Sequence, residues 1–141
     1  MDLSPWTRYR LWRHLTQERI GCEFKFLAEG NLNAVTQAVE AAVARCVTGY
    51  SCKKAWLSDT KITAHPVIKK LGWVVLDTTV TMTIRLNGIS AGHTSVQVSV
   101  HAQVNKADAE SHSGMQDFEQ QLRQSLDAVL DSRDITVEPM K

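Results

Sequence analysis

Two segments of alternating apolar and polar residues restrict the fold of this chain more than any other feature. Apolar residues occupy every even position of 80–86 and of 96–104, and polar residues occupy the positions between them. A period of two sustained over this length, in segments rich in Val and Thr, is typical of antiparallel strands with one buried face. We therefore expect two such strands, at residues 78–86 and 95–105.

The shared even numbering also restricts how these two strands pair. If both apolar sets face one core, the numbers of paired residues must add up to an even value, as for Leu86 with Val96. A plain two-residue hairpin at 87–88 would give an odd sum. We therefore expect a longer loop, or a β-bulge near Gly92.

The remaining elements follow from helix caps, breaking residues and apolar spacing. We expect an N-terminal helix after Ser4-Pro5, a strand over 22–27, a helix capped by Asn31 or Asn33 and ending near Cys46, short strands over 53–57 and 61–64, a helix opened by a capping box at Ser113, and a short extended tail over 135–137. Consecutive antiparallel strands with helices before and after them indicate an α+β fold.

The expected architecture is an antiparallel sheet of about 4–5 strands packed against two helices, with an additional N-terminal helix. A chain of 141 residues is long enough for one core without metals or disulfides. We therefore expect a single domain over 1–141, made of a Trp/Arg-rich helix (1–19), an α+β core (20–131) and a tail (132–141).

The order of these elements resembles a shortened helix-grip arrangement, in which an antiparallel sheet curls around a long C-terminal helix. START-like ligand-binding domains have that fold. The resemblance covers residues 23–131 and rests on element order alone, so it transfers no site residues. It implies an apolar pocket between the sheet and the C-terminal helix, and hence a small hydrophobic-ligand-binding protein as an alternative function.

Composition and local patterns indicate the compartment. The chain is 43% hydrophobic and 22% charged, as in ordinary globular proteins. No apolar run approaches the ~20 residues that span a bilayer, and residues 1–15 lack the apolar stretch of a signal peptide. Three cysteines without a CxxC spacing fit a reducing compartment. We therefore expect a cytoplasmic protein with no transmembrane segment.

Charge is distributed unevenly along the chain. Residues 1–105 contain twelve Lys/Arg and seven Asp/Glu, hence +5, and residues 106–141 contain four and eight, hence −4. Such a separation can orient a partner or a second copy of the chain. The alternative interpretation is a solvated acidic helix surface.

No motif specifies a catalytic, cofactor or metal site. Dinucleotide and Walker A glycine patterns, HExxH, CxxC pairs and GxSxG are absent, and Cys46, Cys52 and His65 match no standard zinc spacing. We therefore expect a non-enzymatic protein with no catalytic residue, cofactor or metal. A thiol-dependent enzyme is the third hypothesis, because Lys53 and Lys54 beside Cys52 would lower its pKa.

The N-terminal helix combines aromatic and cationic side chains, which are the commonest anchors of protein contacts. Alternatives are packing of its aromatic side on the sheet, contact with an anionic membrane surface, or nucleic acid binding, which is not favoured. Its candidate interface residues are Trp6, Arg8, Tyr9, Arg10, Trp12 and Arg13.

The outward face of the two long strands is polar but almost uncharged. Exposed sheet faces more often carry Lys and Glu, whereas Thr, Ser and Gln can be desolvated and can hydrogen-bond across an interface. The alternative is an ordinary solvated face. The sequence thus predicts a protein-binding or assembly module that self-associates. The candidate interface residues of this face are Thr79, Thr81, Thr83, Gln97, Ser99 and His101.

Overall fold

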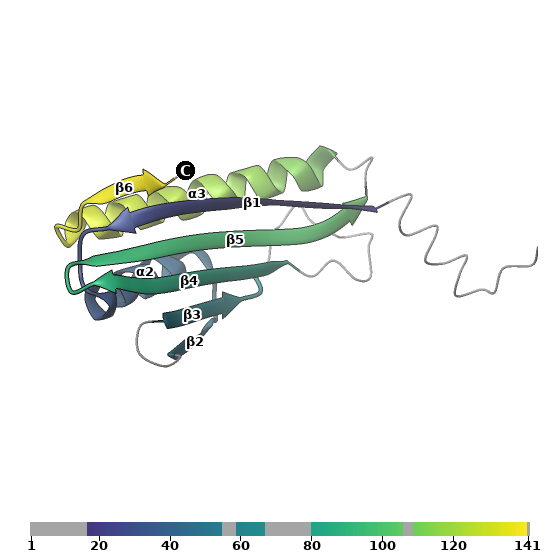
Figure 1. The fold of residues 1–141 in the computed structure, drawn as a ribbon. Coiled ribbons are helices and arrows are strands. Elements are labelled where there is room, and N and C mark those ends of the chain that lie inside the picture. Colours follow the sequence, from purple (N-terminus) through teal and green to yellow (C-terminus); the bar gives the residue numbers. More distant parts are fainter. Residues whose placement is uncertain (1–16, 55–58, 67–79, 106–108, 141) are drawn as a thin grey trace, which may run out of the picture.

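A computed structural model describes residues 17–54, 59–66, 80–105 and 109–140 (Figure 1). All strands form one six-stranded antiparallel sheet in the order β2-β3-β4-β5-β1-β6. The elements are β1 (Gln17–Ala28), α2 (Leu32–Cys46), β2 (Ser51–Lys54), β3 (Asp59–Ala64), β4 (Thr81–Ser90), β5 (His93–Asn105), α3 (Ala109–Ser132) and β6 (Val137–Met140).

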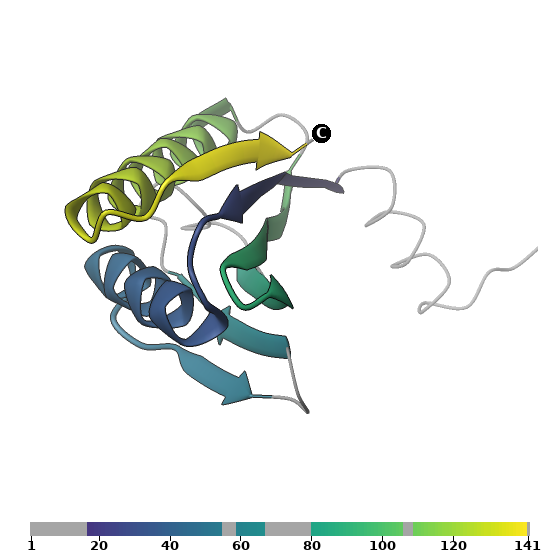
Figure 2. The same ribbon diagram turned by 60° about the vertical axis from the view of Figure 1, so that its left-hand side comes forward.

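The described elements form two layers. Helices α2 and α3 lie side by side on one face of the sheet, and α3 runs along β1 (Figures 1 and 2). This arrangement confirms the predicted α+β class and the packing of two helices on an antiparallel sheet. The expected strand number of 4–5 is too low, because β6 adds a sixth strand within the segment predicted to be a tail.

The turn after α3 explains the additional strand. Asp134 adopts a left-handed conformation (φ 58°), the Asp134 N–H donates to the Asp131 carbonyl at 3.0 Å, and the Ile135 N–H donates to the Leu130 carbonyl at 2.9 Å. These bonds form a Schellman motif, which ends a helix and reverses the chain. The reversal brings Val137–Met140 against the free edge of β1.

The pairing of β4 with β5 confirms the parity prediction. Leu86 is opposite Val96, and the partner numbers add up to 182 over most of the ladder. At the end of the hairpin, a two-residue turn pairs Ser90 with His93, and these two numbers give an odd sum. An irregularity between Gly88 and Ser90 shifts the register by one residue, so the rest of the ladder has an even sum. The bulge expected near Gly92 therefore lies just before the turn.

The core lies between the sheet and the helices. It combines the even-numbered faces of β1–β5 with one stripe of each helix, as predicted. Ala42 lets the helices approach closely, and the Ser125 hydroxyl of α3 donates to its carbonyl at 3.0 Å. The largest fully buried side chains are Val35, Val39, Val43, Ile62, Met82, Ile84, Leu86, Val96, Val98, Leu122, Leu126 and Leu130.

Several predicted boundaries are wrong, and two of them concern the predicted helices. Residues 17–19 belong to β1 and not to the N-terminal helix, because they pair with the end of β5. Helix α3 begins at Ala109 and not at Ser113, because the polar start of the helix carries no apolar stripe that the sequence could show. No helix in the described ranges is both long enough and apolar enough to cross a bilayer.

Candidate functional site

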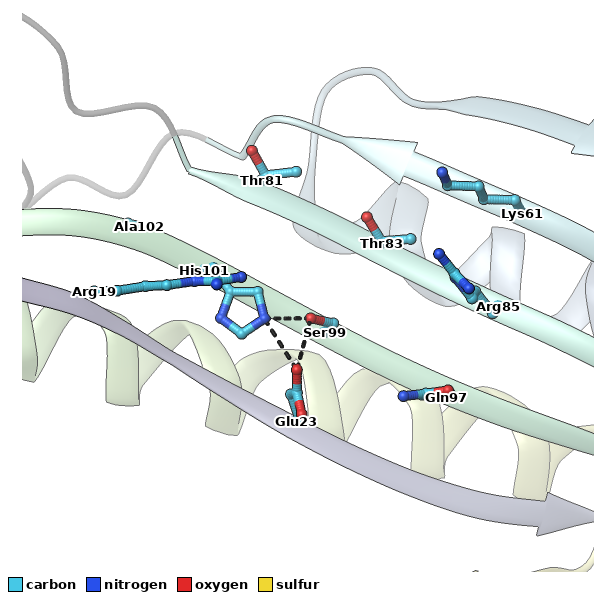
Figure 3. A pocket seen from close by; sticks show the side chains of 10 residues that line it. All are labelled: Arg19, Glu23, Lys61, Thr81, Thr83, Arg85, Gln97, Ser99, His101 and Ala102. Atoms are coloured by element: carbon cyan, nitrogen blue, oxygen red, sulfur yellow. Dashed lines mark hydrogen bonds and ion pairs between the residues drawn. The ribbon is translucent and has the colours of Figure 1, made fainter.

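The candidate site is the face of the sheet opposite α2 and α3, which no described element covers. It is formed by the odd-numbered residues of β1–β5 and the even-numbered residues of β6, and we call it the outer face. A depression of about 600 Å³ follows it across β1, β5, β4 and β3 (Figure 3). The lining residues are Arg19, Glu23, Lys61, Thr81, Thr83, Arg85, Gln97, Ser99, His101 and Ala102.

The structure brings together the predicted interface residues of this face that it describes. Each lies in the depression, and the strand register gives the reason: His101 is opposite Thr81, and Ser99 is opposite Thr83. Their role as an interface stays a prediction. The remaining candidates lie outside the described residues, namely Trp6, Arg8, Tyr9, Arg10, Trp12, Arg13 and Thr79.

A hydrogen-bonded cluster occupies the middle of the depression. The His101 Nε2 atom lies 3.2 Å from a Glu23 carboxylate oxygen. It also forms a short hydrogen bond with the Ser99 hydroxyl (Figure 3). The same hydroxyl donates to the Glu23 oxygen at 3.4 Å. Two acceptors on one ring nitrogen require a proton there, so we assign the Nε2–H form to His101.

This cluster differs from a Ser–His–acid catalytic triad. In a triad the hydroxyl contacts one ring nitrogen and the acid orients the other, so that the imidazole can take the hydroxyl proton. Here Ser99 and Glu23 both contact Nε2 of His101. This geometry therefore holds the three side chains together around one ring nitrogen.

Gly21 makes room for the cluster. It is opposite His101 in the β1–β5 ladder. A Cβ atom at this position would lie 1.9 Å from the Val100 carbonyl oxygen and 2.7 Å from His101 Nδ1. The sequence interpretation missed this contact, although a glycine inside a strand pattern is a known sign of close backbone approach.

The expectation of an almost uncharged face concerned the two long strands alone, and the neighbouring strands add cations to the outer face. Arg85 is joined on this face by Arg19 and Lys25 of β1, Lys53 of β2 and Lys61 of β3, all exposed. The prediction considered β4 and β5 alone, and their Thr, Ser and Gln side chains are flanked in the full sheet by cations from the neighbouring strands. The face therefore has a hydroxyl-rich centre with cations around it.

The pocket implied by the helix-grip resemblance is largely filled. Core side chains occupy the space between the sheet and α3, and an open groove of about 330 Å³ remains where β1, α3 and β6 meet. The Arg123 guanidinium lies 3.9 Å from the centroid of the Phe24 ring there and forms an ion pair with Glu119 at 3.1 Å. The groove also contains Phe26 and Val137.

The cysteine environments do not favour thiolates. Burial, reinforced by Glu119, raises the pKa of Cys22 to about 11. Cys52 lies in β2, not in a loop, and burial together with Glu40 raises its pKa although Lys54 acts in the opposite direction. The expectation that neighbouring lysines lower the net pKa of Cys52 is thus wrong. No three His, Cys, Asp or Glu residues of the described ranges lie close enough to hold a metal ion.

The raised pKa of Cys22 makes its alkylation strongly pH-dependent. In a Cys46→Ser/Cys52→Ser variant, Cys22 should react at pH 8 roughly 100-fold more slowly in the folded than in the urea-unfolded protein, because about two pKa units separate the thiolate populations. The rate should rise toward a midpoint near 11, above the ordinary value of 9.0. A midpoint near the ordinary value in the folded protein would contradict the assigned environment.

Comparisons with known proteins leave the family open. No protein-family model and no curated protein sequence matches the chain. Among solved structures, an aromatase/cyclase (ZhuI) from a Streptomyces species is similar with a TM-score of 0.38 and 10% identity, covering 83% of this chain and 94% of that one. A conserved protein from Geobacillus kaustophilus has a TM-score of 0.29 and 9% identity, covering 83% and 99%. At these TM-scores neither likeness identifies a function.

Proposed function

We propose that this protein is a non-enzymatic protein-binding module that self-associates, with the outer face of its sheet as the contact surface. The observation that carries this proposal is the depression of about 600 Å³ on a sheet face that no described element covers. The opposite face of the sheet is buried under α2 and α3 (Figure 2).

The chemistry of the outer face supports protein contact. Thr81, Thr83 and Ser99 contribute hydroxyls that donate or accept hydrogen bonds and cost less to desolvate than charges. Exposed cations at the rim would remain partly solvated, as in the polar rim of a typical interface. The cluster of Glu23, Ser99 and His101 restricts its own side chains in advance, which lowers the entropy lost on binding.

A steric variant tests the contact surface. Thr83→Tyr places a large, uncharged, strand-compatible side chain in the middle of the depression. The weight-average mass of the wild-type chain in sedimentation equilibrium should rise with concentration, and the variant should require at least tenfold higher concentration for the same mass. Gln37→Tyr on the exposed side of α2 is the matched control and should behave as the wild type.

Two outcomes would overturn the proposal. A wild-type chain that keeps the monomer mass at all accessible concentrations does not self-associate. An association that Thr83→Tyr leaves unchanged does not use the outer face, and a residue 1–16 deletion would then test the predicted Trp/Arg contact.

A second candidate function is supported by the groove where β1, α3 and β6 meet. Phe24, Phe26 and Val137 supply apolar surface, and Arg123 supplies a cation beside it. This combination fits a small apolar molecule that carries a carboxylate. A groove of about 330 Å³ is at the lower end of the volumes that hold small ligands, so we rank this function second.

A further inference from the structure

The strand register places like charges directly beside one another on the outer face. Lys53 is opposite Lys61, and Lys61 is opposite Arg85. The line continues from Arg85 through Gln97 to Lys25. It crosses five adjacent strands without an acidic member, and we call Lys53, Lys61, Arg85 and Lys25 the cation row.

The cation row lacks internal compensation. None of its four side chains forms an ion pair with another described residue. Like charges directly opposite one another destabilise a sheet. Asp59, Glu23 and Glu138 lie on the same face in neighbouring rows, and Glu23 is engaged by His101. An anionic surface docked on the row would therefore relieve a repulsion that the monomer retains.

The shape of the face also centres on this row. A second depression of about 410 Å³ shares Lys61, Arg85 and Gln97 with the first, and it extends toward Asp59 and Asn87. The middle of the row, Lys61 and Arg85, thus lies where the two depressions adjoin. A partner element that follows the strands would pass over it.

A complementary surface exists on the same molecule. Asp127, Asp131 and Asp134 line a depression of about 830 Å³ at the C-terminal end of α3, and we call these three residues the acidic end. None of them forms an ion pair with a described residue. Asp127 and Asp131 are four residues apart on a helix with no basic residue in its last turn. Their mutual repulsion and the negative end of the helix dipole both destabilise the two carboxylates at these positions.

We propose that the acidic end of one molecule docks on the cation row of a second copy. This inference rests on the proposed function and names the partner of the same face. No ion pair between described residues compensates either surface, and contact between them would give the charges opposite neighbours. The acidic end belongs to the helix layer and the cation row lies on the opposite face of the sheet, so we expect a head-to-tail contact that produces a ring or an open chain of copies.

The same observations disfavour nucleic acid as the occupant. Proteins that bind single strands on a sheet stack the bases on aromatic side chains. The described odd-numbered positions of β1 and β3–β5 carry no Phe, Tyr or Trp, and the His101 ring is held by Ser99 and Glu23. Residues 106–141 also carry a net charge of −4, which would repel a polyanion. A protein surface with carboxylates, as on the acidic end, fits the face better.

Charge reversal on each surface tests the proposal. The first variant is Lys61→Glu/Arg85→Glu on the row, and the second is Asp127→Lys/Asp131→Lys on the acidic end. All four side chains are exposed, so circular dichroism should show an unchanged fold. Each variant alone should self-associate at least tenfold more weakly than the wild type, because attraction becomes repulsion at the contact.

Mixing the two variants is the decisive measurement. In the mixture the acidified row of one variant faces the basic end of the other, so association should return and should weaken with added salt. Arg45→Glu/Lys54→Glu is the control with the same change in net charge, on exposed residues away from the outer face, and it should associate as the wild type. The first reversal variant and the control both have a net charge of −3, so loss of association in the first variant alone would assign the effect to the row and not to net charge.

Three other outcomes would overturn the inference. Unchanged self-association of both reversal variants, together with dissociation by Thr83→Tyr, would keep the outer face as the contact but remove the acidic end as its partner. A mixture that stays monomeric would also remove the pairing. The first variant could also bind nucleic acid less tightly than the wild type while its self-association is unaffected. That result would assign the row to a polyanion.

Discussion

Replacing Ile84 or Val98 with Asp should prevent folding, whereas Asp at Thr83 should leave the fold intact. Ile84 and Val98 are fully buried partners on the helix-facing side of β4 and β5, and Thr83 is half-buried on the outer face. An uncompensated buried carboxylate costs at least several kcal/mol, and a domain of this kind has a total stability of about 5–15 kcal/mol. Far-ultraviolet circular dichroism of the three variants measures the difference.

A conservative variant separates charge from packing. Ile84→Val removes one methyl group from the same site and should cost about 0.5–1.5 kcal/mol while the chain remains folded. If Thr83→Asp lost the native signal as completely as Ile84→Asp, the assignment of the two sheet faces would be wrong.

Gly21→Ala should destabilise the protein strongly. The new Cβ would meet the Val100 carbonyl oxygen at 1.9 Å, which is backbone and cannot rotate away, and His101 Nδ1 at 2.7 Å. Relief requires a shift of β1 against β5, so we expect a loss of about 3 kcal/mol or more in the free energy of unfolding, at the upper end of overpacking effects. Urea denaturation measures it.

Gly92→Ala is the matched control, because nothing lies within 4 Å of a Cβ atom at that turn position. It should change the free energy of unfolding by less than about 0.5 kcal/mol. Equal stability of both alanine variants would show that β1 and β5 do not approach as closely as the structure has them. The imidazole resonances of His101 should shift in Gly21→Ala and not in Gly92→Ala, because its ring occupies the space above Gly21.

The sequence predicted the parts of the fold that follow from local periodicity. The even apolar positions of β4 and β5 determined both their buried face and the parity of their pairing, because a register shift of one residue would expose a whole apolar set. The apolar stripes of α2 and α3 were equally legible, since their spacing of three and four residues produces one buried face. The side chain of Asn31 caps α2 as expected, with its oxygen 2.8 Å from the Ala34 N–H.

Elements without such a pattern were predicted poorly. The polar first turn of α3 has no apolar stripe, and β6 is only four residues long, so its place in the sheet depends on the Schellman turn at Asp134 and on the free edge of β1. Short strands gain most of their stability from the neighbour they pair with. Their existence is therefore decided by contacts between residues far apart in the chain.

The candidate site shows the same division. Alternation alone identified Thr81, Thr83 and Ser99 as outward-facing. The cluster of Glu23 with His101 and the row that joins Lys25 to Lys53 arise from pairing of β1 with β5 and of β2 with β3. Partners in these ladders are separated by up to 88 residues, as Gln17 and Asn105 are. Local periodicity specifies the face on which a side chain lies, but the neighbours across the sheet depend on strand order and register, which arise only when the whole core is packed.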